Sequence, residues 1–147
     1  MTKVTENYHI YLKATEIAAI AAAKLRGNGN GKAADKVATE AMRKVLQESN
    51  IHTRVVIGEG ERDDAPMLFI GEEMGDLSSD LKIDIAVDPL ECTNHCAKNL
   101  PDALAVLAAA PRGALLHAPD TYMDKLCGSK DLVGKLSLSN SISENLL

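Results

Sequence analysis

The sequence predicts a layered α/β fold of the α+β kind, in which two helices are followed mostly by strands. Apolar side chains recur at helical spacing in the first third of the chain. Short runs rich in Val and Ile, each stopped by Gly or Pro, follow further along and are typical of buried strands. This order differs from the regular alternation of βαβ repeats, so we expect helices layered on a sheet.

The first helix is expected over residues 8–25 and the second over 33–48. The glycine- and asparagine-rich segment 27–31 ends the first helix, since both residue types accept the left-handed conformation at a helix terminus. Its glycine spacing, and Ala33 after Lys32, do not match a phosphate-binding loop. The predicted apolar faces consist of Tyr11, Ala14, Ala18, Ala21, Ala22 and Leu25 in the first helix, and Ala38, Ala41, Met42 and Val45 in the second.

Five strands are expected after the helices, at residues 53–57, 67–70, 81–87, 103–109 and 114–117. Two of the apolar runs end in carboxylates, which would repel one another without a compensating cation. Oxygen ligands of this kind suit Mg²⁺ or Mn²⁺, although a solvated acidic turn neutralised by Arg62 is the alternative. The two acidic groups are Glu59, Glu61, Asp63 and Asp64 after the first strand, and Asp88 and Glu91 after the third.

The segment from Asp88 to Thr93 is the more specific of the two. Pro89 is expected to end the strand and force a turn that gathers the Asp88 carboxylate, the Leu90 carbonyl and Glu91. Thr93 then offers a hydroxyl, and the amides that follow could meet a phosphate. An ordinary acidic turn is the alternative, but it would leave the Asp88 carboxylate without a ligand at a buried junction.

The bulk composition limits the classes of protein. A chain of 147 residues with 46% hydrophobic residues has room for one domain with a core, which must be aliphatic because aromatic residues make up 3%. The net charge of −5 argues against a nucleic-acid partner or an anionic membrane surface. No apolar run approaches the ~18 residues of a membrane span. The N-terminus has no apolar signal core, which favours the cytoplasm.

The remaining chemically active residues carry weaker signals. Three cysteines without Cys-x-x-Cys spacing favour free thiols over zinc binding or disulfides. His9 and His52 are expected at the surface and His117 in the core, whereas His95 is a candidate neighbour of the site. On spacing alone, Asp35 is expected to cap the second helix in its first turn.

The Ser-rich stretch 135–147 ends where residues 143–147 resemble the start of a helix. We therefore expect a fragment, in which residues 1–134 form an N-terminal metal-binding half. Residues 135–147 would begin the connection to a missing C-terminal half.

Three segments together resemble the class II fructose-1,6-bisphosphatases, including the type that also hydrolyses sedoheptulose-1,7-bisphosphate. They are Gly58-Glu-Gly-Glu-Arg-Asp-Asp-Ala-Pro66, Asp84-Ile-Ala-Val-Asp-Pro-Leu-Glu-Cys-Thr93 and Ala118-Pro-Asp-Thr-Tyr122. The resemblance implies a layered αβαβα sugar-phosphatase fold, of which this chain is the N-terminal half. It also implies hydrolysis of the 1-phosphate of a sugar bisphosphate with Mn²⁺ or Mg²⁺, a role in carbohydrate metabolism and a homo-oligomer.

By motif position, the resemblance carries metal binding onto Asp35, Glu59, Asp88 and Glu91. Glu61 would be a catalytic or accessory acid, Thr93 would orient the attacking water, and Glu91, Thr93 and Tyr122 would contact substrate. The family has glycine at the position of Cys92, so this position is expected to need a positive φ or a close approach of phosphate. The competing hypothesis is a truncated or degenerate chain that folds or associates without catalysis.

Overall fold

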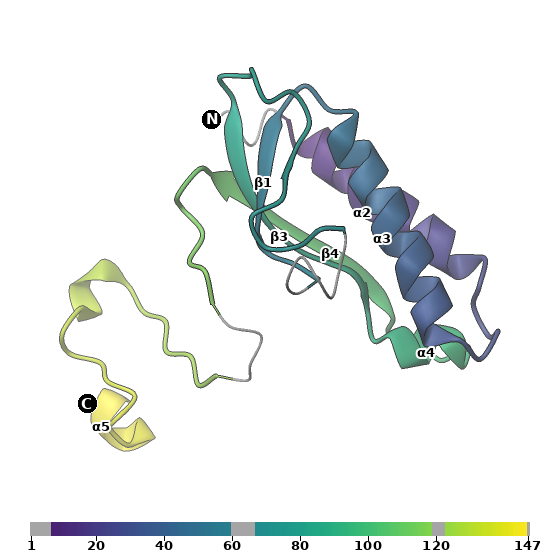
Figure 1. The fold of residues 1–147 in the computed structure, drawn as a ribbon. Coiled ribbons are helices and arrows are strands. Elements are labelled where there is room, and N and C mark those ends of the chain that lie inside the picture. Colours follow the sequence, from purple (N-terminus) through teal and green to yellow (C-terminus); the bar gives the residue numbers. More distant parts are fainter. Residues whose placement is uncertain (1–6, 60–66, 119–122, 147) are drawn as a thin grey trace.

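The computed structural model describes residues 7–59, 67–118 and 123–146. Its elements are shown in Figure 1. In chain order they are α2 (Tyr8–Ala23), α3 (Gly31–Gln47), β1 (His52–Ile57), β2 (Glu73–Met74), β3 (Lys82–Glu91), α4 (Thr93–Ala97), β4 (Leu104–Pro111), the 3₁₀ helix η1 (Lys130–Leu132) and α5 (Ile142–Leu146).

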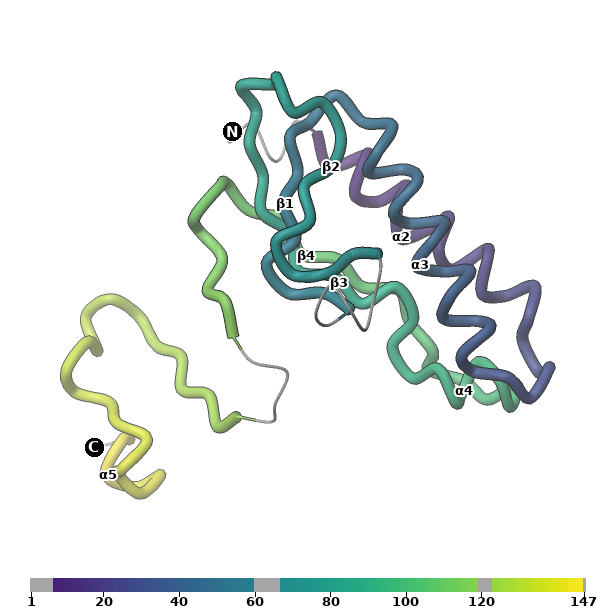
Figure 2. Tube along the Cα trace, in the orientation of Figure 1, coloured from purple at the N-terminus to yellow at the C-terminus, as the bar shows by residue number. Residues whose placement is uncertain are grey.

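The four strands form one mixed sheet in the order β2-β1-β3-β4. β1 runs parallel to β3, whereas β2 and β4 pair antiparallel with β1 and β3. The long helices α2 and α3 lie side by side across one face of this sheet (Figures 1 and 2). The expected arrangement of helices layered on a sheet is therefore confirmed.

The face of α2 that meets the core is built from small side chains. Ala14, Ala18 and Ala22 are each at most 2% exposed, and Tyr11 extends the same stripe at 8%. Alanines at this spacing allow the backbone of α2 to approach α3 and the sheet closely. The helix ends at Ala23, two residues earlier than expected, and its cap residue Lys24 keeps a right-handed conformation; the left-handed Gly27, with φ 78°, lies in the turns that follow.

Helix α3 begins two residues earlier than expected, at Gly31. The side chain of Asn30 accepts a hydrogen bond from the Ala33 amide at 3.1 Å and caps the helix. Asp35 therefore lies beyond the first turn, which contains no acidic residue, and the capping interpretation of Asp35 is wrong. On the core face of α3, Ala38, Met42 and Leu46 are fully buried.

Two of the five predicted strands do not form. Residues 67–70 are turns, because Leu68 and Gly71 both take positive φ values (54° and 88°) that break an extended backbone. The strand that follows is the two-residue β2. Residues 114–117 are also irregular, since β4 ends in a turn in which the Ala114 amide donates to the Pro111 carbonyl at 2.9 Å.

The histidine predictions were partly wrong. His52 is buried at 8% exposure, because β1 lies inside the sheet and Nε2 of His52 is 3.1 Å from the Glu73 carboxylate. His117 is exposed and not in the core, although its Nδ1 lies 3.1 Å from the Val56 carbonyl oxygen. His9 is exposed, as expected.

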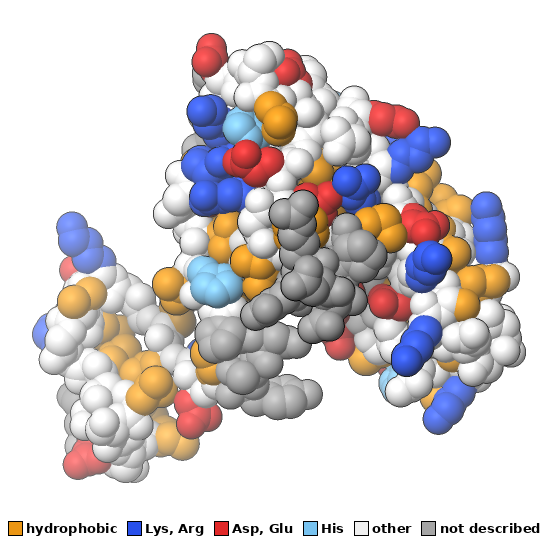
Figure 3. Space-filling model, viewed as in Figure 1, with side chains coloured by type: hydrophobic (Ala, Val, Ile, Leu, Met, Phe, Trp, Pro, Cys, Tyr) orange, Lys and Arg blue, Asp and Glu red, His pale blue; other side chains and the backbone are white. Residues whose placement is uncertain are grey.

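The surface of the helical layer carries both signs of charge (Figure 3). Two pairs one turn apart on α3, Lys36 with Glu40 and Lys44 with Glu48, lie 3.9 and 4.0 Å apart. Exposed pairs of this kind contribute little to stability. No helix within the described ranges is long and apolar enough to cross a membrane.

Residues 123–146 stand apart from the helices and the sheet (Figure 1). Within them, Ser141 and Glu144 form a reciprocal cap at the start of α5. The Glu144 carboxylate accepts from the Ser141 amide at 2.7 Å, and the Glu144 amide donates to the Ser141 hydroxyl at 3.3 Å. The predicted helix start at this point is therefore confirmed.

Candidate active site

An acidic cavity of about 680 Å³ lies where β1 and β3 end and α3 and α4 begin. It is lined by Asp35, Ile57, Gly58, Glu59, Val87, Asp88, Leu90, Cys92, Thr93, Asn94 and His95. Four of the residues predicted from the sequence, Asp35, Glu59, Asp88 and Thr93, therefore meet at one place. Glu91 is exposed and does not line the cavity. Glu61 and Tyr122 lie outside the described residues, so their roles stay predictions.

The sheet topology explains why these residues converge. β1 and β3 are parallel, so their carboxyl ends meet at one edge of the sheet, with Glu59 after β1 and Asp88 near the end of β3. The start of α3 packs against α4 at the same edge: a Cβ on Gly31 would lie 3.4 Å from the Thr93 carbonyl. This contact brings Asp35 and Thr93 to the cavity together.

The chain does not leave the sheet at Pro89, contrary to expectation. β3 continues to Glu91, with an irregularity in its register between Asp88 and Glu91. The Leu90 amide donates to the Asp88 carboxylate at 3.0 Å within this irregular part of the strand. Pro89 removes a ladder hydrogen bond, and the bulge accommodates this loss without ending the strand.

The site holds mutually repelling carboxylates. Burial, then the hydrogen bond and charge of Glu91, and finally the charge of Asp35 raise the pKa of Asp88 to about 6, although the Leu90 amide opposes this shift. Burial also raises the pKa of Asp35. Below about pH 6, Asp88 therefore keeps a proton that a carboxylate in water would release. A cation between the carboxylates would reverse this effect.

Cys92 takes a left-handed backbone conformation, with φ 62° and ψ 52°. Its carbonyl accepts from the His95 amide at 2.8 Å and so begins α4. The thiol lies 3.7 Å from the Glu91 carboxylate. Partial desolvation and the nearby Glu91 carboxylate raise the pKa of this thiol. The positive φ expected at this position is confirmed, and a residue with a Cβ occupies it.

His95 is one of the residues that line the cavity. Its Nδ1 lies 2.8 Å from the Pro101 carbonyl oxygen, which can only accept, so Nδ1 carries the proton. The sequence placed His95 near the site, and the cavity confirms that position.

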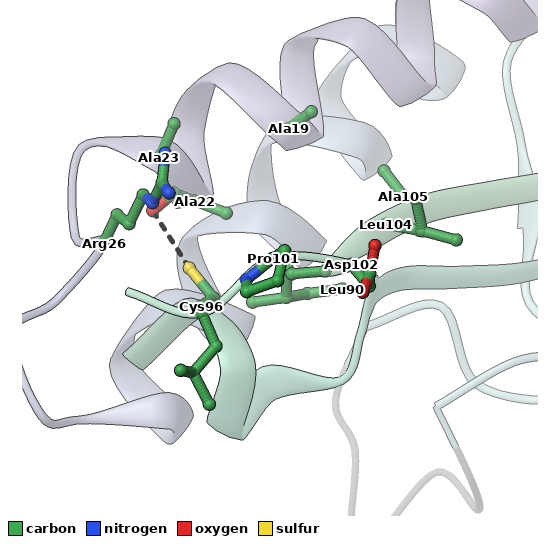
Figure 4. Close-up of a pocket in the computed structure, with 12 residues that line it drawn as sticks. Ala19, Ala22, Ala23, Arg26, Leu90, Cys96, Pro101, Asp102, Leu104 and Ala105 are labelled. Carbon is green, nitrogen blue, oxygen red and sulfur yellow. Dashed lines mark hydrogen bonds between the residues drawn. The ribbon is translucent and has the colours of Figure 1, made fainter. Parts of the chain in front are cut away.

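A second cavity, of about 240 Å³, shows how α4 is held in place (Figure 4). It lies between α2, α4 and the start of β4, and small apolar side chains make up most of its lining. The Cys96 thiol contacts the Ala22 carbonyl at 3.6 Å, and the Gly27 amide donates to the Cys96 carbonyl at 2.9 Å. These contacts fix α4, and with it Thr93, against the end of α2.

The donor chemistry of the acidic cavity fits a hard divalent cation. Its carboxylates are oxygen donors, and the burial and neighbouring carboxylates that raise the pKa of Asp88 are effects that a bound cation would offset. Within the part of the chain that the structure describes, no three His, Cys, Asp or Glu side chains are close enough together to form a coordination sphere. The carboxylates surround the cavity and would have to move inward to share an ion.

Asp88→Asn should leave the metal-free protein at least as stable as wild type near neutral pH. The folded state of wild type retains a proton on Asp88 between about pH 4 and 6, where the unfolded chain has released it. The free energy of unfolding of wild type therefore falls as pH rises through this window. Allowing for solvent screening, the loss amounts to roughly 1–2 kcal/mol. Asn has no proton to lose, so the variant lacks this decline.

Urea denaturation of both proteins at pH 4.5 and 7.5, with chelator present, measures the effect. The difference in free energy of unfolding between wild type and variant, compared at the two pH values, isolates the contribution of Asp88 from that of the other titrating groups. Mn²⁺ at millimolar concentration should then raise the melting temperature of wild type and have little effect on the variant. A strongly destabilised metal-free variant that keeps its Mn²⁺ response would show that Asp88 is only a structural turn residue.

Comparison with known proteins identifies relatives over nearly the whole chain. The family model described as bacterial fructose-1,6-bisphosphatase, glpX-encoded, matches residues 6–147. Relatives in Prochlorococcus marinus (strains MIT 9313 and MIT 9303) and Parasynechococcus marenigrum (strain WH8102) are each named D-fructose 1,6-bisphosphatase class 2/sedoheptulose 1,7-bisphosphatase. Each is 50% identical over 135 residues, which is 92% of this chain and 40% of the relative. The chain thus spans about 40% of the length of these relatives.

Proposed function

Because the chain belongs to the glpX-encoded bacterial fructose-1,6-bisphosphatase family, we propose that it forms the metal-binding part of a sugar bisphosphatase. The proposed reaction is hydrolysis of the 1-phosphate of fructose-1,6-bisphosphate, and also of sedoheptulose-1,7-bisphosphate. The observation that carries this proposal is the convergence of Asp35, Glu59, Asp88 and Thr93 on one acidic cavity.

The carboxylates of the cavity supply the proposed metal ligands. Asp35, Glu59 and Asp88 would hold Mn²⁺ or Mg²⁺, and Glu91 would join them by turning from its exposed position beside Asp88. When bound, such an ion polarises phosphoryl oxygens and lowers the pKa of a bound water.

The first turn of α4 supplies the proposed polar contacts. The Thr93 hydroxyl would orient the attacking water, and the anchoring of α4 on α2 and on the start of α3 supports this role. Glu61 as an accessory acid, Tyr122 as a substrate contact and a homo-oligomeric cytoplasmic enzyme complete the proposal.

The test uses a chimera in which residues 6–147 replace the matching part of the Prochlorococcus marinus relative. Phosphate release from fructose-1,6-bisphosphate is measured with Mn²⁺, with Mg²⁺ and with chelator, beside the unaltered relative. We expect metal-dependent release that Asp88→Asn lowers at least about 100-fold, as expected for loss of a metal ligand. Release from an inositol phosphate, with none from the sugar bisphosphate, would place the site in a different phosphatase family.

A chain that folds without catalysing hydrolysis is the second candidate function. The left-handed Cys92 favours it, because a side chain occupies a position at the cavity where the backbone conformation suits glycine. A folded chimera that releases no phosphate, beside an active unaltered relative, would support this candidate.

A further inference from the structure

Glu72 is a buried carboxylate close to the acidic cavity but absent from its lining. It is 6% exposed and accepts a hydrogen bond from Arg43 Nε at 2.7 Å. Its second oxygen accepts from the amide of Leu68. Both oxygens of one buried carboxylate are thus used, one by a side chain of α3 and one by the backbone of a turn.

The backbone of Leu68 connects Glu72 to the acidic cavity. Leu68 is fully buried and holds a left-handed φ of 54°, which is unfavourable for a bulky residue and persists only where neighbours fix it. The amide of Leu68 donates to the Glu72 carboxylate. The carbonyl of Leu68 accepts from the Glu59 amide at 3.0 Å. Glu59 lines the cavity. The backbone of Leu68 therefore links Glu72 directly to a site residue.

Gly58 permits this link. A Cβ at position 58 would lie 2.1 Å from the Leu68 carbonyl oxygen, closer than any real contact. The absence of a side chain thus allows the Leu68 carbonyl to reach the residue that follows.

Helix α3 is connected to both sides of the cavity. Asp35 lines the cavity from its N-terminal part, and Arg43 lies eight residues further along, or about 12 Å at the rise of an α-helix. Arg43, Glu72 and Leu68 connect the same helix to Glu59. A shift of Glu59 relative to Asp35 would require this chain of contacts to break.

We propose that Glu72, held by Arg43, is a positioning residue that fixes Glu59 through the backbone of Leu68. The effect of Glu72 on metal binding rests on the proposed function. The placement of Glu59 by Glu72 does not depend on the proposed function. The competing explanation is a buried ion pair that stabilises the fold and has no particular effect on Glu59.

The test compares Glu72→Gln with Glu73→Gln. In Glu72→Gln an amide NH₂ replaces one carboxylate oxygen, so the variant side chain must lose either the Arg43 bond or the Leu68 bond. Glu73 makes ion pairs with Arg112 and His52, each at 3.1 Å, and neither partner lines the cavity. It is therefore a matched control of the same chemistry in the next residue.

Two measurements are made on each folded, metal-free variant of the full chain. Amide hydrogen exchange of Glu59 reports its bond to Leu68, and titration calorimetry with Mn²⁺ reports the site. In Glu72→Gln we expect Glu59 to exchange at least about tenfold faster and Mn²⁺ to bind roughly tenfold more weakly, as for loss of a supporting hydrogen bond at a metal site. Glu73→Gln should change either value by less than about twofold.

Unchanged exchange of Glu59 in Glu72→Gln would overturn the proposal, as would equal losses in both variants. Faster exchange with unchanged Mn²⁺ affinity would overturn the positioning role at the site. If wild type binds no Mn²⁺, the proposed function fails, while the exchange of Glu59 still decides the structural part. If Glu72→Gln does not fold, Arg43→Lys replaces it: it keeps the charge and should give smaller changes in the same direction, and no change in Glu59 exchange would overturn the proposal.

Discussion

Replacing Asp84 with alanine should lower the free energy of unfolding by about 3–5 kcal/mol, the range seen when one partner of a buried ion pair is removed. Asp84 lies in β3 and is fully buried. Arg54 binds both its oxygens, at 3.0 and 2.9 Å, and the Gly113 amide donates to it at 2.7 Å. Arg112 Nε lies 3.0 Å from Oδ1, although poorly aligned for a hydrogen bond. Alanine would leave two guanidinium groups without their shared carboxylate.

Urea denaturation followed by circular dichroism measures this loss at pH 7. Burial would raise the pKa of Asp84, but the bonds from Arg54 and Gly113 and the charges of Arg54 and Arg112 hold it below its usual value. The stabilisation is therefore complete above the ordinary pKa of Asp and is lost as pH falls below it. Glu73→Ala removes a 42% exposed carboxylate at the edge of the same network and should cost less than about 1 kcal/mol. An Asp84→Ala loss as small as this control would contradict the prediction.

Replacing Cys92 with glycine should stabilise the protein and improve the site. The left-handed conformation costs a residue with a Cβ about 1 kcal/mol, whereas glycine adopts it freely. We expect the melting temperature to rise by roughly 2–4 °C, the range for a domain of about 150 residues. In the chimera, loss of the side chain from the cavity wall should raise phosphate release by about tenfold or more, if contact with phosphate is what the side chain obstructs.

Cys92→Ala is the control for this prediction, because it removes the sulfur and keeps both the Cβ and the strained backbone. Thermal unfolding of the three proteins, with phosphate release by the corresponding chimeras, separates the two effects. A gain shared by alanine and glycine would assign the effect to the sulfur. No gain in phosphate release with either substitution would show that the cavity tolerates a side chain at this position.

Much of the site could be predicted because its residues follow strong local patterns. Glu59 and Asp88 come after apolar runs that could only be buried strands, and parallel strands bring such ends together. For Cys92, resemblance to a family with glycine there left a positive φ and a close approach of phosphate as alternatives, and the structure shows the positive φ. Asp35 was different, since spacing alone indicated a helix cap, and Asn30 performs that role.

The errors arose where tertiary contacts override local signals. β2 has only two residues, so its identity depends on pairing with β1 and not on its own sequence. The strand expected at 67–70 was lost because Glu72, a residue outside it, holds Leu68 in a turn. The burial of Asp84 was not foreseeable either, since its partners Arg54 and Arg112 lie far from it in the sequence, on β1 and just beyond β4.

The exposed strand β4 has a consequence for how the protein behaves at high concentration. Among the described residues it pairs only with β3, so its outer edge presents backbone donors and acceptors to solvent. Its sequence, Leu-Ala-Val-Leu-Ala-Ala-Ala-Pro, contains no charge, and Leu104 and Val106 are 57% and 44% exposed. An uncharged apolar edge strand can pair with a strand of a neighbouring molecule. The edge strands of native proteins usually carry a lysine, a proline or a bulge that prevents this pairing. Within β4 such protection comes from Pro111 alone, at the far end, so we expect β4 to promote aggregation of this chain at high concentration.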